Sequence, residues 1–251
     1  MAASIAEASA DNRKPDLLFK LEGFGGDVND AIFAFNKDAI ITGSDDRILR
    51  VWVRRDGKRF WPSVCELLPS SVTTLFYCTE MKKIYAGLDN GTIVEFLLAD
   101  DTNSLKHIKD YLAHVARVTG IVCALEMEWL VSTSKDRTVA WYHLKSGSQL
   151  GEYLLEFPGT CIQYDSGSNY LFVGDTSGRI SLLCFSLNSN GARGECRMIR
   201  ELQGHGESVN YLAWDVATSR LLSGSSDSVV ILWDIGGGKG SAYELQVQYL
   251  N

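Results

Sequence analysis

Leu221–Trp233 reads LLSGSSDSVVILW and is the fifth occurrence of one thirteen-residue pattern. The earlier occurrences are Ile40–Trp52 (IITGSDDRILRVW), Ile84–Phe96 (IYAGLDNGTIVEF), Leu130–Tyr142 (LVSTSKDRTVAWY) and Leu171–Leu183 (LFVGDTSGRISLL). The seventh position is polar in every copy and holds Asp46, Asn90, Asp136, Ser177 and Asp227. Successive seventh positions are 41 to 50 residues apart, a period that predicts a propeller or a solenoid.

Each copy predicts two β-strands joined by a tight turn. Apolar runs rich in β-branched and aromatic residues flank a short polar stretch, and Asn90-Gly91 is the strongest hairpin signal. Further strands are expected before the copies at Ala31–Phe35, Thr74–Tyr77, Gly120–Leu125, Cys161–Tyr164 and Tyr211–Trp214. Weaker ones are expected after them near Lys58–Trp61, Leu105–Tyr111, Gln149–Leu154, Cys196–Leu202 and Ala242–Val247. Four strands in about 40–50 residues are one blade of a β-propeller.

Eighteen residues before the seventh position, a small side chain recurs. Four copies have valine there (Val28, Val72, Val118 and Val209), and the fourth copy has Gly159.

The residues of the fifth copy resemble the WD repeat signature. Gly204-His205, Asp227 and Trp233-Asp234 match its Gly-His, Asp and Trp-Asp elements at the expected spacing. Copy three matches it with substitutions, through Ala113-His114, Asp136 and Tyr142, and copy one keeps Asp46 and Trp52 but has Phe24 in place of the histidine. Copies two and four are assigned by their period alone.

The resemblance extends to one group, the WD-repeat and FYVE-domain-containing proteins. It covers roughly residues 13 to 246. The stretches that carry it are Phe60–Ser63, Gly87–Ile93, Leu125–Trp129, Gly224–Asp227, Trp233–Gly237 and Glu244–Gln246. The resemblance implies an endosomal adaptor with seven repeats and a FYVE zinc finger, of which this chain would be the amino-terminal WD-repeat portion. The expected fold is thus an all-β WD-repeat β-propeller with five four-stranded blades, an incomplete part of a seven-bladed one.

The domain boundaries follow from the repeats. We expect a disordered tail at 1–16 and a propeller at 17–247, with repeats at about 24–63, 64–113, 114–155, 156–203 and 204–247. In closed WD propellers the amino-terminal strand completes the last blade, and Leu17–Leu21 is similar to that strand. The last five residues, VQYLN, depart from the family where the next repeat would begin, so we expect a truncated or spliced form, with a closed five-blade ring as the alternative.

Composition indicates a protein of the cytoplasm, with early endosomes implied by the resemblance for full-length family members. The net charge is −7, and Lys and Arg form no cluster beyond Arg54-Arg55 and Lys82-Lys83. We therefore expect no nucleic-acid partner and no direct membrane binding. The most apolar stretch, Gly120–Val131, is too short for a membrane span, and the amino terminus lacks a signal-peptide pattern. The six cysteines are widely spaced and are expected to be reduced.

One set of residues could suggest catalysis. His205 and Asp227, with Ser223 or Ser225, are the residue types of a hydrolase triad. The same set recurs as His114 and Asp136 with Ser132 or Ser134, and duplication favours a structural role. By resemblance, these residues, together with Trp233, Tyr142, Asp46 and Trp52, form the WD hydrogen-bond network; strand alternation leaves the choice between the serines open.

Cofactor sites are not indicated. Four histidines and six cysteines include no Cys-x-x-Cys and no His-x-x-x-His pair, so we expect no metal, and the FYVE finger that would bind phosphatidylinositol 3-phosphate is not expected in this chain. The glycine-rich stretch Gly236–Ser241 lacks the spacing of a phosphate-binding loop.

Three functions remain in competition. The first is a non-enzymatic scaffold that binds other proteins through its rims, by resemblance in endosomal trafficking and signalling. The alternative is a substrate receptor of a ubiquitin ligase, although Trp233-Asp234 is followed by Ile235-Gly236 rather than the expected x-Arg. The third, a propeller enzyme, would need acidic or histidine clusters that the sequence does not show.

Overall fold

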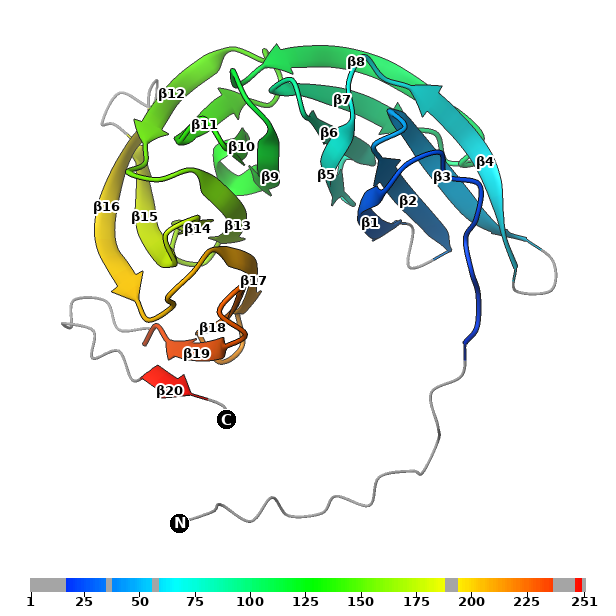
Figure 1. Ribbon diagram of the computed structural model, residues 1–251. Helices are drawn as coiled ribbons and strands as arrows, with labels where there is room; N and C mark the ends of the chain where they lie inside the picture. The colour runs from blue at the N-terminus through cyan, green and yellow to red at the C-terminus, as the bar shows by residue number, and fades with distance from the viewer. Residues whose placement is uncertain (1–16, 35–37, 56–58, 188–193, 237–246, 250–251) are drawn as a thin grey trace.

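The chain folds into five antiparallel four-stranded sheets that follow one another around an arc (Figure 1). This computed structural model describes residues 17–34, 38–55, 59–187, 194–236 and 247–249. Each sheet takes its strands in chain order, from the inner strand to the outer strand, as one blade of a propeller. The prediction of an all-β propeller with five four-stranded blades is therefore confirmed.

The observed strands agree with the predicted ones in number and order, but several are longer than predicted. In chain order they are β1 Val28–Ala34, β2 Ala39–Ser44, β3 Ile48–Arg55, β4 Arg59–Leu67, β5 Val72–Cys78, β6 Lys83–Leu88, β7 Thr92–Leu98, β8 Leu105–Leu112, β9 Val118–Ala124, β10 Trp129–Ser134, β11 Thr138–His143, β12 Gln149–Leu154, β13 Gly159–Asp165, β14 Tyr170–Asp175, β15 Arg179–Leu187, β16 Gly194–Gln203, β17 Val209–Asp215, β18 Arg220–Ser225, β19 Val230–Asp234 and β20 Val247–Tyr249. Each inner strand begins at the recurring small residue, two to three residues before the expected start.

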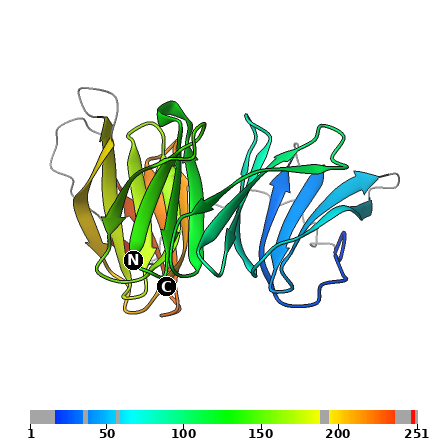
Figure 2. The same cartoon turned by 90° about the horizontal axis from the view of Figure 1, so that it is seen from above.

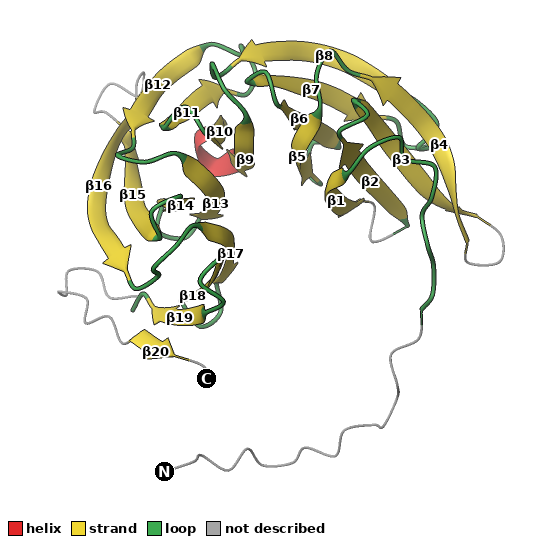
Figure 3. Cartoon of the chain, in the orientation of Figure 1, coloured by secondary structure: helices red, strands yellow, loops and turns green. Residues whose placement is uncertain are grey.

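Three segments differ from the prediction. Leu17–Leu21 forms no strand; instead Phe19 packs edge-on against Phe60 of β4, at 6.0 Å between ring centroids. The fourth strand of blade 5 is β20, which uses residues beyond the family resemblance, while Ala242–Gln246 and the proposed tail at 1–16 lie outside the described residues. Leu125 belongs to a short 3-10 turn, η3 (Leu125–Met127), which is red in Figure 3.

The turn between the second and third strands has the same backbone shape in every blade. The residue after the seventh position has a left-handed φ each time: Arg47 66°, Gly91 89°, Arg137 71°, Gly178 92° and Ser228 66°. Glycine is required twice, because a Cβ atom at Gly91 would lie 2.1 Å from the carbonyl oxygen of His114 and one at Gly178 would lie 2.5 Å from that of His205.

Side chains on the inner strands lock the blades to one another. The first valine of one blade fits against a glycine in the second strand of the blade before it. A Cβ atom added to that glycine would lie 2.3 Å from Val72 at Gly43, 2.8 Å from Val118 at Gly87 and 2.9 Å from Val209 at Gly174. At the junction of blades 3 and 4 the sizes are exchanged: Thr133 replaces the glycine and Gly159 replaces the valine, where a Cβ atom would lie 2.1 Å from Thr133 Oγ1. Figure 2 shows the same fold from above.

Candidate functional site

The WD residues of blade 5 form one directed chain of hydrogen bonds. Trp233 Nε1 donates to Ser223 Oγ at 2.8 Å, and Ser223 Oγ lies 2.7 Å from His205 Nε2. His205 Nδ1 lies 3.0 Å from Asp227 Oδ2. Since the carboxylate can only accept, His205 donates from Nδ1, and the Ser223 hydroxyl, which accepts from the indole, can donate to Nε2 of the neutral imidazole. The carboxylate also accepts from the backbone N–H groups of Gly206 and Val229, both at 2.9 Å, so it ties the incoming loop to the turn.

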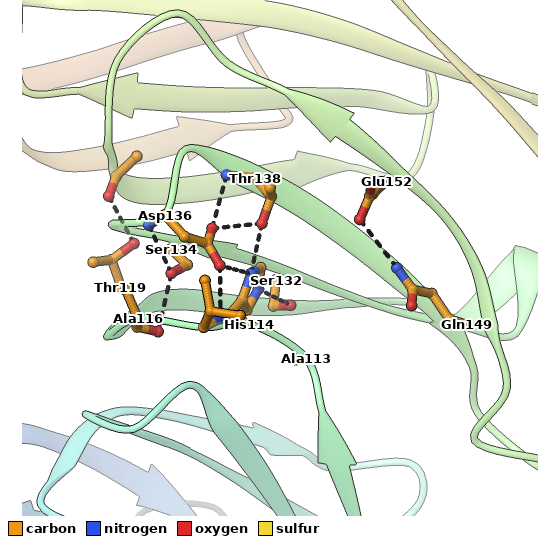
Figure 4. A network of polar contacts seen from close by, with 12 residues as sticks. Ala113, His114, Ala116, Thr119, Ser132, Ser134, Asp136, Thr138, Gln149 and Glu152 are labelled. Atoms are coloured by element: carbon orange, nitrogen blue, oxygen red, sulfur yellow. Dashed lines mark hydrogen bonds and ion pairs between the residues drawn. The ribbon is translucent and has the colours of Figure 1, made fainter.

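Blade 3 repeats the contacts among serine, histidine and aspartate, but a tyrosine stands in place of the tryptophan (Figure 4). His114 Nε2 lies 2.9 Å from Ser132 Oγ, and His114 Nδ1 lies 3.2 Å from Asp136 Oδ2 and 2.7 Å from Thr138 Oγ1. The Thr138 hydroxyl donates to Asp136 Oδ1 at 2.5 Å and so can accept from the histidine. Tyr142, at the position of the tryptophan, donates instead to the carbonyl of Ala113 at 3.3 Å.

The structure resolves the choice between the serines. Ser223 and Ser132 contact the histidines, whereas Ser225 and Ser134 serve the turn. Ser225 Oγ donates to the carbonyl of Glu207 at 3.0 Å, and Ser134 Oγ donates to that of Ala116 at 3.1 Å. Both hydroxyls also accept the backbone N–H of the seventh-position aspartate.

The electrostatics of the networks follow from burial and hydrogen bonding. Burial lowers the pKa of His114, whose side chain is fully enclosed, so its imidazole is held neutral. Burial by itself would raise the pKa of Asp227, but bonds from Gly206, Val229 and His205 outweigh it and lower the value to about 2. The pKa of Asp136 is lowered in the same way, against the effect of its burial, by bonds from Thr138 and Val115 and by the nearby His114.

Blade 1 reaches the same result with an ion pair. Arg50 donates to both carboxylate oxygens of Asp46, at 3.1 and 2.7 Å, and both side chains are about nine-tenths buried. The guanidinium lies 5.0 Å from the centroid of the Phe24 ring, and Phe24 stands at the sequence position that holds histidine in blades 3 and 5. Trp52 Nε1 donates to Thr42 Oγ1 at 2.9 Å. The bonds from Arg50 hold the pKa of Asp46 well below its usual range.

Blades 2 and 4, where the signature is weakest, have smaller networks. Asn90 Oδ1 accepts only from the backbone N–H of Thr92, at 3.1 Å, among the described contacts of that side chain. In blade 4 the aspartate stands two positions earlier: Asp175 Oδ1 accepts from Ser177 N at 2.8 Å, Ser177 Oγ at 2.7 Å and Arg179 N at 3.2 Å. Sequence reasoning passed over Asp175, Arg50 and Thr138, although an Asp two positions before a seventh-position serine is a usable signal.

The triad-like sets are closed to substrates. Ser132 and Ser223 have no exposed surface, and their hydroxyls are engaged by the histidines and, at Ser223, by Trp233. A nucleophilic serine must reach a carbonyl carbon, and no substrate atom can approach these hydroxyls. In the described part of the chain, no three His, Cys, Asp or Glu side chains are grouped to hold a metal ion, and no helix could span a membrane. The arrangement positions loops and offers no reactive group.

Apolar side chains gather instead on the rim above these networks. The outer strands of blades 1, 2 and 3 end in Leu67, Leu112 and Leu154, which pair with residues just after the seventh-position turns and are 65%, 86% and 66% exposed. Val115, in the loop that carries His114, is 92% exposed. We call Leu67, Leu112, Val115 and Leu154 the network rim.

Comparison with known proteins gives consistent matches. The family model described as WD domain, G-beta repeat, matches residues 15–53 and 196–234. WD repeat and FYVE domain-containing protein 2 of Homo sapiens is 40% identical over 246 residues, which are 98% of this chain and 60% of that protein. Protein 1 of the same name from Homo sapiens is 40% identical over 246 residues, covering 98% and 58%. Protein 2 from Caenorhabditis elegans is 36% identical over 239 residues, covering 95% and 56%.

The chain thus spans at most 60% of the length of these relatives. Among solved structures, a computationally designed protein, Ika8, superposes with a TM-score of 0.67 at 21% identity, over 85% of this chain and 60% of that one. That likeness concerns the fold.

Proposed function

The chain belongs to the WD repeat and FYVE domain-containing proteins, as their WD-repeat portion, and we propose that it is a non-enzymatic scaffold that binds other proteins through the network rim. The observation that carries this proposal is the recurrence of an exposed leucine beside the seventh-position turn of blades 1, 2 and 3. Isolated exposed apolar residues are ordinary, but here an exposed leucine stands at the equivalent position of three adjacent blades.

The networks beneath this rim supply its rigidity. His114 and Asp136 fix the loop that presents Val115, because Asp136 Oδ2 accepts the Val115 N–H at 3.0 Å. A loop held in place before binding loses less conformational freedom when a partner orders it. A rigid frame with exposed apolar loop residues suits protein recognition.

The test is quantitative affinity capture from cell extract with matched variants. The rim variant is Leu112→Ser with Val115→Ser, and the control is Leu97→Ser with Val216→Ser, which alters exposed apolar residues at the opposite ends of strands β7 and β17. We expect a set of proteins retained by the unaltered chain and the control but lost by the rim variant, with equal melting temperatures for all three. Equal capture by both variants would contradict the proposal.

We further propose that the chain acts in endosomal adaptor assemblies, as the FYVE domain in the names of its relatives suggests. By this proposal, the WD portion supplies protein contacts and does not itself bind phosphatidylinositol 3-phosphate. Co-sedimentation with vesicles containing that lipid at physiological salt should leave the chain in the supernatant. Sedimentation that depends on the lipid would contradict this division of roles.

A further inference from the structure

The junction of blades 2 and 3 contains two cysteines in contact. Cys78 ends β5, the inner strand of blade 2, and Cys123 is the last residue but one of β9, the inner strand of blade 3. Cys78 is 2% exposed, and the half-buried Cys123 packs against the apolar cluster to which Cys78 belongs. The Cys123 thiol donates a hydrogen bond to the sulfur of Cys78. Thiols in contact can form a disulfide with little movement of the backbone, and this one would join two blades.

Cys123 stands where the other blades have an aromatic residue. In every blade the last residue but one of the inner strand pairs with the first residue of the thirteen-residue pattern, as Cys123 pairs with Leu130. The other four blades have a ring at this position: Phe33, Tyr77, Tyr164 and Trp214. The repeat therefore shows that packing at a blade junction does not require a thiol here.

The core around the two thiols is also polar. Tyr85 pairs with Glu95 across β6 and β7, whereas the equivalent pairs in the other blades are apolar: Ile41 with Val51, Val131 with Trp141, Phe172 with Leu182 and Leu222 with Leu232. Glu95 has no exposed surface; Lys83 Nζ lies 2.6 Å from its Oε1, and the Tyr111 hydroxyl donates to its Oε2 at 2.6 Å. The Tyr85 hydroxyl is buried in the same cluster as the thiols and has no hydrogen-bond partner among the described residues. It can donate to a small polar molecule that reaches them.

The hydrogen bond between the thiols makes them unequal in acidity. It lowers the pKa of Cys78, against the effect of burial, because it stabilises the thiolate. It raises the pKa of Cys123, together with burial, because Cys123 is the donor. The thiolate is the form that attacks an oxidant, so Cys78 is the attacking thiol and Cys123 is the one that reacts second.

We propose that Cys78 and Cys123 are a site of reversible oxidation by hydrogen peroxide, at which a disulfide links blades 2 and 3. The Cys78 thiolate attacks one peroxide oxygen, the O–O bond breaks and hydroxide leaves, so that Cys78 becomes a sulfenic acid. The sulfur of Cys123 then attacks that of Cys78; the S–S bond forms, the S–O bond breaks, and the oxygen leaves as water. Two thiols are thereby oxidised, and one peroxide, with the protons of both thiols, becomes two molecules of water.

This site is separate from the network rim. Val72, at the start of β5, pairs with Leu88 beside the seventh-position turn, whereas Cys78, at its end, pairs with Lys83. The disulfide would therefore lie at the opposite end of the inner strands. It would close a loop of 45 residues that contains β6, β7 and β8. A cross-link of this kind removes conformations of the unfolded chain, so the oxidised form should be the more stable one.

The test begins from a chain that carries Cys65→Ser, because Cys65 is exposed and would react with peroxide by itself. This chain is incubated with a small excess of hydrogen peroxide, its free thiols are alkylated, and it is digested with trypsin. The tryptic peptides 60–82 and 118–135 then contain one cysteine each, Cys78 and Cys123. Mass spectrometry should find these peptides as one disulfide-linked product that dithiothreitol separates. Absence of this product would overturn the proposal.

Two further variants, in the same Cys65→Ser chain, test the order of attack. Cys78→Ala introduces the residue that blades 1 and 3 have at this position, and it should leave Cys123 unmodified by peroxide. Cys123→Ser should instead trap Cys78 as a sulfenic acid, which dimedone labels. A label on Cys123 in the first variant, or none on Cys78 in the second, would overturn the assigned order.

The melting temperature measures what the cross-link does to the fold. The peroxide-treated chain should melt several degrees above the chain treated with dithiothreitol, and this difference should vanish with Cys123→Ser. The matched control is Cys161→Ser, at a thiol of blade 4 that donates to the carbonyl of Val209, and it should keep the difference. An unchanged or lowered melting temperature of the linked chain would contradict a stabilising cross-link.

Discussion

Blade 3 and blade 1 place an aspartate at the same turn and stabilise its carboxylate by different means. In blade 3 the partner is a neutral histidine from the preceding loop, and in blade 1 it is a charged arginine from the third strand. Both aspartates still accept one N–H from the incoming loop and one from the turn, at Val115 and Thr138 in blade 3 and at Gly25 and Ile48 in blade 1. The backbone bonds are thus the constant part of the network, and the side-chain partner can be exchanged.

The two solutions differ in what their loss would leave behind. A neutral imidazole without its partner exposes a polar group to an unfavourable environment. A guanidinium without its partner leaves a full charge nine-tenths buried, which is far more costly. The comparison therefore ranks the networks by their sensitivity to substitution.

The largest effect is expected at Asp46. We expect Asp46→Ala to lower the free energy of unfolding by about 3–5 kcal/mol, because Arg50 would remain buried without a counter-charge. Urea denaturation followed by tryptophan fluorescence measures the change. The double variant Asp46→Asn with Arg50→Leu removes both charges and should recover part of the loss. If the double variant is no more stable than Asp46→Ala, the buried charge is not the cause.

An intermediate effect is expected in blades 5 and 4. Asp227→Ala and Asp175→Ala should each cost about 1–3 kcal/mol, because each leaves backbone donors of its turn unpaired. Ser177→Ala should cost less, since Asp175 would keep both of its backbone partners. Urea denaturation midpoints are sufficient for this comparison if the slope of the unfolding free energy against urea concentration is the same in all variants. A larger loss for Ser177→Ala than for Asp175→Ala would show that the seventh-position residue, Ser177, stabilises this turn more than Asp175 does.

The smallest effect is a dependence on pH that blade 3 confers. The pKa of His114 is lowered by burial, so the folded chain resists a proton that the unfolded chain takes up near pH 6.5. The free energy of unfolding should therefore decline as the pH falls below about 6.5 toward the folded pKa of His114, and this contribution should be flat above that value. His114→Gln should reduce the slope of the free energy of unfolding against pH, measured by urea denaturation at a series of pH values. Equal slopes in the variant and the unaltered chain would exclude His114 as its source.

Most of the fold could be predicted from the sequence because every blade repeats the same local pattern of residues. A polar turn between apolar runs fixes the second and third strands, and the interval between copies leaves room for two more. Strand ends were less predictable: β4 continues to Leu67 through Pro62, which the short estimate near Lys58–Trp61 did not include. Leu17–Leu21 has a strand-like composition, but strand pairing depends on a neighbouring edge, which composition does not report.

The candidate site was less predictable where geometry chooses between equivalent residues. Ser223 and Ser225 are two residues apart on one strand, so their side chains lie on the same face. Only Ser223 contacts the imidazole of His205, whereas Ser225 bonds the carbonyl of Glu207. Arg50 could not be assigned because the WD pattern expects its histidine in the preceding loop, and an arginine in the third strand has no place in that pattern. Asp175 was missed because we assumed that the side chain that accepts the turn's N–H groups always stands at the seventh position of the pattern.

The left-handed turns have a consequence for how this protein can be recombined. In blades 2 and 4 the turn residue is glycine because the loop carbonyl of the following histidine occupies the space of its Cβ atom. Blade 2 is thereby matched to blade 3, and blade 4 to blade 5, while the turns after Asp46 and Asp136 tolerate arginine. Transplanting a histidine loop behind an arginine turn would bring a side chain against that carbonyl. Blades 2 and 3, and likewise blades 4 and 5, should therefore be moved together, and a chimaera that places a histidine loop after an arginine turn should be destabilised.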